Sequence, residues 1–210
     1  MTAQQFGDFD QGLAALGRDL CAEGGPQIST MRNYRFAILP YPPSREFELR
    51  RKILRFTEEL RADGWAVLPI SLQKLLLDRI RSTGEENVVG MIAREKRLYE
   101  RDPERALGYI REKIAPLIEG PNGIAADVCR MIDEFADQHP ELTDRSLVII
   151  GRAGALYPLF RTSALLKHID GKTRNLPVVL LYPGERRDQT GLSFMGVFDA
   201  DRDYRPRIYP

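Results

Sequence analysis

The chain has 210 residues, enough for one α/β core with a helical appendage, and we expect a single domain over 1–210. Its 31 basic and 30 acidic residues nearly cancel, so no overall field points to nucleic acid or an acidic membrane. No apolar run approaches the ~20 residues of a membrane span, and residues 1–10 lack the pattern of a secretory signal. These features indicate a soluble, cytoplasmic protein.

The N-terminal part of the chain reads as helix, strand, helix, strand. Residues 1–26 are expected to form a helix and a Gly/Pro linker, because apolar residues recur at helical spacing: Phe6, Phe9, Leu13, Leu16 and Leu20. A strand at 34–39 leads into a proline cluster and a helix that begins near Ser44. The next strand, 65–70, contains Pro69, which cannot donate to a ladder and belongs at a strand end or a sheet edge. This order predicts a βαβ unit.

Residues 72–139 show no strand pattern. Apolar residues recur instead at helical spacing, and Asp102 and Pro103 have the pattern of an N-cap and a first helical residue. The stretches predicted as helices are 72–80, 88–99, 102–117 and 128–135. A parallel crossover needs only one helix, so we interpret 72–139 as a helical insertion between the second and third strands, either a lid or a docking surface.

The most informative segment is 147–169. Its first four residues, LVII, are a continuous apolar run, which predicts a strand covered on both faces of a parallel sheet. Gly151 and Gly154 in the following GRAG should allow a sharp turn, with a helix directly after it. Further elements are expected in the C-terminal half of the sheet, 145–210: strands at 177–181 and 192–198, and an edge strand or extended arm at 204–209.

These elements predict an α/β fold with a Rossmann-like open parallel sheet flanked by helices. Because the carboxyl ends of parallel strands meet at one edge, where ligands usually bind, the segments after 34–39, 147–150 and 177–181 should converge there. The side chains we predict for partner or anion binding are Tyr41, Arg45, Arg152, Tyr157, Arg161, Tyr182, Arg205 and Arg207. In the alternative interpretation, the tyrosines only pack over the end of the sheet.

The sequence contains no recognisable catalytic, cofactor or metal motif. The tripeptide 171–173, GKT, follows a helix and lacks the earlier glycine of a phosphate-binding loop, and GRAG lacks the GxGxxG of a dinucleotide site. His139 and His168 have no nucleophile in a recognisable setting, and Cys21 and Cys129 stand alone and are expected to be buried. We therefore predict no catalytic residue, no cofactor and no metal, although sites assembled across strands often leave no local motif.

Several stretches of the chain together resemble a known family. They are RFAILPYPPSREFELRR at 35–51, RAGALYPLFRTSALLKHI at 152–169, PVVLLYPG at 177–184, and SFMG followed by YRPRIY near the C-terminus. These stretches resemble the BrxB family of BREX bacteriophage-defence systems. The resemblance implies a small cytoplasmic protein that acts with a phosphatase-like PglZ protein, a PglX methyltransferase and a large BrxC ATPase. It supplies no catalytic residue for this chain.

The leading hypothesis is a non-catalytic BREX component, not an enzyme, that binds and positions or regulates a partner. The PglZ-like protein is the first partner we expect, followed by the PglX-like methyltransferase and the BrxC-like ATPase. The alternative is a degenerate nucleotide- or phosphate-binding domain, in which the GRAG turn and Arg152 hold an anion at a helix N-terminus. Residues 145–210 hold 11 basic and 6 acidic residues, which leaves DNA binding open. A homodimer is also left open.

Overall fold

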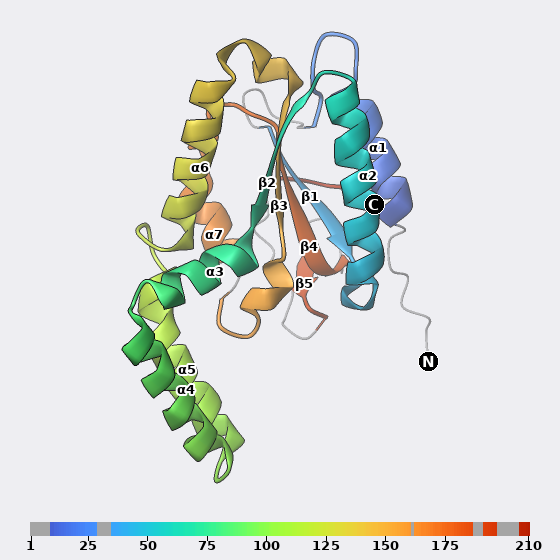
Figure 1. The fold of residues 1–210 in the computed structure, drawn as a ribbon. Coiled ribbons are helices and arrows are strands. Elements are labelled where there is room, and N and C mark those ends of the chain that lie inside the picture. Colours follow the sequence, from blue (N-terminus) through green and yellow to red (C-terminus); the bar gives the residue numbers. More distant parts are fainter. Residues whose placement is uncertain (1–8, 29–34, 161, 187–190, 197–205) are drawn as a thin grey trace, which may run out of the picture.

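The fold is an open, mainly parallel sheet between two layers of helices (Figure 1). The computed structural model describes residues 9–28, 35–160, 162–186, 191–196 and 206–210. In this part of the chain the strand order is β2-β3-β4-β1-β6, and β5 pairs antiparallel with the end of β4. The strands are β1 (Phe36–Tyr41), β2 (Ala66–Ser71), β3 (Ser146–Gly151), β4 (Val178–Arg186), β5 (Leu192–Phe194) and β6 (Arg207–Ile208). The predicted α/β fold with a Rossmann-like open sheet is confirmed.

Each face of the sheet has its own helices. The α-helices are α1 (Phe9–Leu20), α2 (Glu46–Ala62), α3 (Leu72–Arg81), α4 (Glu85–Tyr99), α5 (Pro103–Ile118), α6 (Ile124–Gln138) and α7 (Thr162–Ile169). Short 3₁₀ turns cover Pro43–Arg45, Pro140–Arg145 and Ala153–Leu156. One core cluster joins α1 and α2 to the sheet, and the other joins α3, α6, α7 and the end of α5 to its opposite face. None of the described helices is long and apolar enough to cross a membrane.

The strand β3 is buried on both faces, as its unbroken apolar run predicts. Leu147 and Ile149 pack in the cluster with α1 and α2, whereas Val148 and Ile150 pack in the cluster with α3, α6 and α7. Parallel pairing with β2 and β4 places β3 inside the sheet. Side chains on both faces can therefore be apolar, which is why no polar residue interrupts 147–150.

The two outer strands follow their sequence signals. Strand β2 pairs with β3 and lies at one end of the strand order, so Pro69 is on an edge strand as predicted. Strand β6 lies at the other end and pairs parallel with β1 through Arg207 and Ile208. Of the two forms predicted for the C-terminus, the chain adopts the edge strand.

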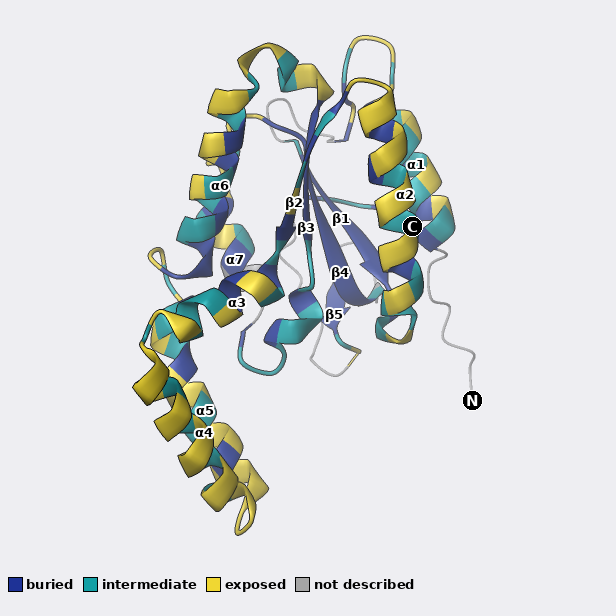
Figure 2. Ribbon diagram, in the orientation of Figure 1, coloured by how far each residue is buried: buried dark blue, intermediate teal, exposed yellow. Residues whose placement is uncertain are grey.

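The predicted helical insertion between β2 and β3 is confirmed, and its four helices have different surroundings. Helix α6 lies along the sheet, whereas α4 and α5 form an antiparallel hairpin that extends away from it (Figure 1). Helix α4 has no buried residue, and the hairpin is mainly exposed (Figure 2). At the base, Arg79 of α3 binds Asp127 of α6 at 2.5 Å and donates to the carbonyls of Leu117 and Gly123, both at 2.7 Å. Arg79 thus fastens the hairpin to the body.

Three local expectations were wrong. The helix predicted directly after GRAG is only the 3₁₀ turn Ala153–Leu156, and α7 begins later, at Thr162. The first strand ends at Tyr41 instead of Leu39, because Pro40 and Tyr41 continue the parallel pairing with β4. Cys21 is exposed and Cys129 is half-buried, although both were expected to be buried. Phe6 lies outside the described residues.

Candidate functional site

Four polar side chains converge at the carboxyl edge of the sheet. Tyr41 ends β1, Glu46 opens α2, Gln73 lies in the first turn of α3, and Arg152 follows β3. The Arg152 guanidinium lies 3.2 Å from Glu46 Oε1 and donates to Gln73 Oε1 at 3.0 and 2.5 Å. The Tyr41 hydroxyl donates to the other oxygen of Glu46. Tyr41 and Arg152 therefore converge as predicted, and both are hydrogen-bonded to Glu46.

The turn after β3 depends on Arg152 rather than on its glycine neighbours. Arg152 has φ 64°, in the left-handed region, whereas neither Gly151 nor Gly154 has a positive φ. This conformation is unfavourable for a residue with a Cβ by roughly 1–2 kcal/mol. The bonds from the guanidinium to Glu46 and Gln73 hold the residue in place. Gly151 and Gly154 were expected to set this turn, but the residue with the left-handed conformation is Arg152.

The environment of Tyr41 keeps its hydroxyl protonated. Burial is the largest cause that raises the pKa of Tyr41 well above its ordinary value of 10.0, and the hydrogen bond to Glu46 and the Glu46 charge add to it. The nearby Arg152 charge acts in the opposite direction and lowers the pKa. Tyr41 is therefore a hydrogen-bond donor to the Glu46 carboxylate.

The predicted tyrosine patch is divided between the two faces of the sheet. Tyr41 packs with the core cluster of α1 and α2, but Tyr182 packs with the other cluster, since Tyr41 pairs with Pro183 in the register. Tyr182 is only 1% exposed, its ring centroid lies 5.5 Å from that of Phe194, and its hydroxyl donates to the Leu192 carbonyl at 3.3 Å. The prediction of a single exposed patch that contains both tyrosines was wrong. Both rings pack over the sheet end, as the alternative interpretation held.

The remaining predicted residues lie apart from this edge cluster or outside the described chain. Tyr157 packs near Phe194, with ring centroids 6.4 Å apart. Arg45 binds Glu48 through two bonds of 2.8 Å and covers the Phe9 ring, so it joins α2 to α1. Arg207 ties β6 to α1 and its following loop through its contacts with Asp19 at 2.8 Å and the Gln27 carbonyl at 3.1 Å. Arg161 and Arg205 are outside the described residues.

The edge cluster of Tyr41, Glu46, Gln73 and Arg152 lines part of an open groove, which we call the α2 groove. It has a volume of about 830 Å³ and runs between α2 and the carboxyl ends of β2 and β3. Its apolar lining includes Phe47, Ile53, Leu54, Pro69, Ile149 and Leu181. Phe47 and Leu54 are 77% and 57% exposed, so part of the apolar lining of the groove is open to solvent. Neither was predicted as a site residue from the sequence, although both lie off the buried stripe of α2 and could have been identified as outward-facing.

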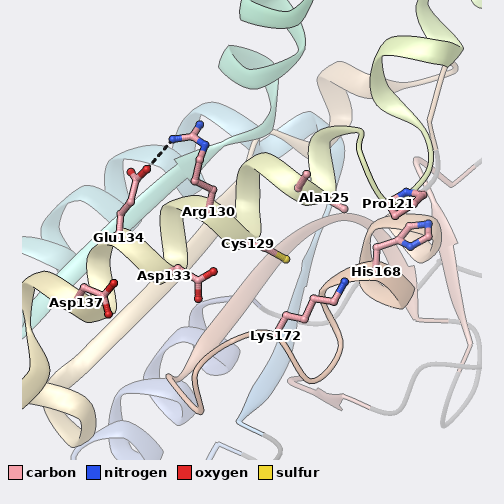
Figure 3. A pocket seen from close by; sticks show the side chains of 10 residues that line it. Pro121, Ala125, Cys129, Arg130, Asp133, Glu134, Asp137, His168 and Lys172 are labelled. Carbon is pink, nitrogen blue, oxygen red and sulfur yellow. Dashed lines mark hydrogen bonds and ion pairs between the residues drawn. The ribbon is translucent and has the colours of Figure 1, made fainter.

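A second, smaller pocket lies between α6 and α7, and Figure 3 shows the Cys129 sulfur and the His168 ring among its lining groups. Burial is the main cause that raises the pKa of the Cys129 thiol, so the reactive thiolate is disfavoured at neutral pH. Asp133 and Asp137 pair with Arg174, at 3.8 and 3.1 Å. Among the described residues no cluster of three or more His, Cys, Asp or Glu is placed to hold a metal ion. This pocket therefore offers no activated nucleophile.

The sheet order, the flanking helices and the carboxyl-edge groove place the chain among the Rossmann-like α/β proteins. Comparison with family models then identifies the chain more closely. The model described as BREX protein BrxB matches residues 68–208, which is more than half of the chain, so the chain belongs to the BrxB family. This membership makes it a component of a BREX defence system and confirms the predicted family. No curated protein and no solved structure matches the chain.

Proposed function

We propose that the chain is a non-catalytic assembly subunit of its BREX system. It binds a PglZ-like component and positions or regulates that protein, and the PglX-like and BrxC-like components are further candidates. The observation that carries the proposal is the α2 groove, where exposed Phe47 and Leu54 stand beside an apolar cleft. Exposed apolar surface of this kind in a water-soluble domain is typical of protein-binding sites.

The polar groups beside the groove support binding rather than catalysis. A catalytic site needs a nucleophile or base whose reactive atom is available to substrate. Here Arg152, Glu46, Gln73 and Tyr41 are bonded to one another, and Tyr41 is held protonated. Their arrangement stiffens the wall of a binding surface, because it joins the end of β1, the first turns of α2 and α3, and the turn after β3.

The phosphate-binding alternative finds less support at the GRAG turn. An anion there would compete with Glu46 and Gln73 for the Arg152 guanidinium. The 3₁₀ turn that follows, Ala153–Leu156, has four residues, so it lacks the aligned peptide dipoles of a full helix N-terminus. Thermal shifts with ATP, GTP and short oligonucleotides should therefore leave the melting temperature unchanged at millimolar ligand. A rise would favour the alternative, since ligand at ~100 times Kd stabilises by about 2.7 kcal/mol.

Pairwise reconstitution tests the proposed function. The purified chain is mixed in turn with the purified PglZ-like, PglX-like and BrxC-like proteins of its own system, and each mixture is resolved by size-exclusion chromatography with light scattering. We expect a stoichiometric complex with the PglZ-like protein. If the chain forms a complex with none of the three components, the assembly role is contradicted.

A further inference from the structure

We propose that the α2 groove binds an acidic amphipathic helix of the partner protein, with the apolar face of that helix against Phe47 and Leu54. This inference rests on the proposed function and specifies its site and the chemistry of the bound segment. Three features of the described residues support it: the spacing of the exposed apolar side chains, the charge of the groove, and the protected edge of β2.

The apolar anchors of the groove have the spacing that a helical ligand requires. Phe47 and Leu54 are seven residues apart on α2, about 10 Å along the helix axis at 1.5 Å per residue. Helices that dock in grooves present apolar side chains at i, i+3 or i+4 and i+7, which span the same length. Besides the two anchors, Ile53, Ile149 and Leu181 contribute to the apolar lining of the groove. An amphipathic helix of two or more turns would cover these side chains.

The charge of the groove favours an acidic ligand. Its charged lining consists of Arg50, Arg51, Arg61, Arg152 and the single acid Glu46. Glu46 is already bonded to Arg152 and Tyr41, so it does little to offset the other three guanidinium groups. Arg50 and Arg51 are exposed and lie on α2 between the apolar anchors. Carboxylates on the flank of a docked helix would meet these guanidinium groups at the rim.

The edge of β2 disfavours a ligand that adds a strand to the sheet. Pro69 has no N–H to donate. On an edge strand, the backbone nitrogen of a proline faces the free edge rather than the neighbouring strand. The Val67 carbonyl, two residues earlier and thus on the same side, already accepts a bond from Arg61 at 3.1 Å. A strand paired there would lose one hydrogen bond and compete for another. A helix makes its own backbone hydrogen bonds, so it avoids both losses.

Matched substitutions on exposed residues test the site. Leu54→Glu places a carboxylate at the apolar contact, and its control is Ile92→Glu on α4, a residue of similar exposure, 49% against 57%. Arg51→Glu reverses a charge in the groove, and its control is Arg55→Glu, an exposed arginine of α2 that does not line it. Binding of the purified PglZ-like protein is measured by calorimetry at low and high salt. All four variants should melt within a few degrees of the unchanged chain.

We expect Leu54→Glu to weaken binding by about tenfold or more, as for an interface hot spot. Arg51→Glu should weaken it several-fold, and more strongly at low salt, where charges are less screened. The controls should bind like the unchanged chain. If the unchanged chain binds the partner and the groove variants bind equally well, the groove is not the site, although the proposed function stands. If no BREX component binds the unchanged chain, the proposed function and this inference both fail.

A photo-crosslinking residue at position 47 identifies the bound segment. In the complex with the PglZ-like protein, we expect it to capture one partner peptide that is rich in Asp and Glu and has apolar residues at i, i+3 or i+4 and i+7. The same probe at position 92 is the control and should capture no such peptide. Capture of a basic segment, or of a second copy of this chain, would overturn the inference.

Discussion

Arg152 combines an unfavourable backbone conformation with a side chain that joins the first turns of α2 and α3. Two substitutions separate these effects, because Arg152→Ala and Arg152→Gly both remove the guanidinium but only glycine adopts φ 64° without strain. We expect both variants to be less stable than the unchanged chain. The glycine variant should be more stable than the alanine variant by about 1 kcal/mol. Alanine carries the energy penalty of the left-handed conformation, and the greater conformational entropy of glycine in the unfolded state offsets part of that difference. Urea denaturation measures the difference, and an alanine variant of equal or greater stability would contradict it.

The raised pKa of Tyr41 makes the stability of the fold depend on alkaline pH. In the unfolded chain Tyr41 loses its proton near pH 10.0, whereas the folded protein retains it to higher pH because of burial and the bond to Glu46. The unfolded state therefore binds fewer protons above that pH and is favoured as the pH rises. The contribution of Tyr41 to stability is complete below pH 10 and is lost above it.

Denaturation at about pH 9 and about pH 11 tests this dependence. We expect the unchanged chain to lose up to about 1.4 kcal/mol per pH unit above pH 10 through Tyr41, and Tyr41→Phe to lose less. Tyr209, whose pKa is also raised, chiefly by burial, remains in both proteins and so cancels in the comparison. An identical pH dependence in the two proteins would show that Tyr41 is not the source.

The pairing register explains why the sequence could not predict how the site residues are arranged. Tyr41 and Tyr182 each end an apolar strand run, so convergence at one edge was predictable from parallel pairing alone. The face on which each ring lies was not, because strands buried on both faces lack a polar alternation. The register of Tyr41 with Pro183 places the two rings on opposite faces. The conformation of Arg152 was equally hidden, since adjacent glycines appeared sufficient for the turn.

At the scale of elements, β3 is the strand on which both cores depend. Ile149→Asp should unfold the protein, because Ile149 is 3% exposed and an unpaired carboxylate there would cost several kcal/mol of a typically small total stability. Leu54→Asp is the control on an exposed residue and should melt near the unchanged temperature. Thermal melting monitored by circular dichroism compares them. A folded Ile149→Asp variant with normal melting would mean that β3 is not a central strand.

The helical insertion shows which features of an element can be predicted locally. Its four helices were predictable from 3.6-residue periodicity, and the cap at Asp102 from its sequence pattern, because both signals are local. Their roles were not predictable in this way. Both α4 and α6 were predicted as helices, yet α6 covers the sheet and α4 buries no residue. The bonds of Arg79 to Asp127 of α6 and the Leu117 carbonyl of α5 join residues far apart in the chain, and no local pattern reveals such contacts.

At the scale of the whole molecule, stability should decrease from the sheet towards the tip of the α4–α5 hairpin. Side chains of β3 and β4 lie in both core clusters, so opening these strands requires global unfolding. Helix α4 packs on α5 without a buried residue, so the hairpin can open while the sheet stays intact. Such an element can change its conformation on binding without loss of the fold.

Hydrogen exchange followed by mass spectrometry tests this gradient, and α6 is the matched control for α4. Both helices have 15 residues, but α6 buries Ile124, Ala125, Val128, Ile132 and Phe135 and α4 buries none. We expect the amides of β3 and β4 to exchange slowest, those of α6 at an intermediate rate, and those of α4 fastest, since exchange follows the free energy of the smallest opening that exposes each amide. If α4 were protected as strongly as α6, some contact would have to cover its exposed Val89, Ile92 and Tyr99. The hairpin would then be a docked element in solution rather than a free one.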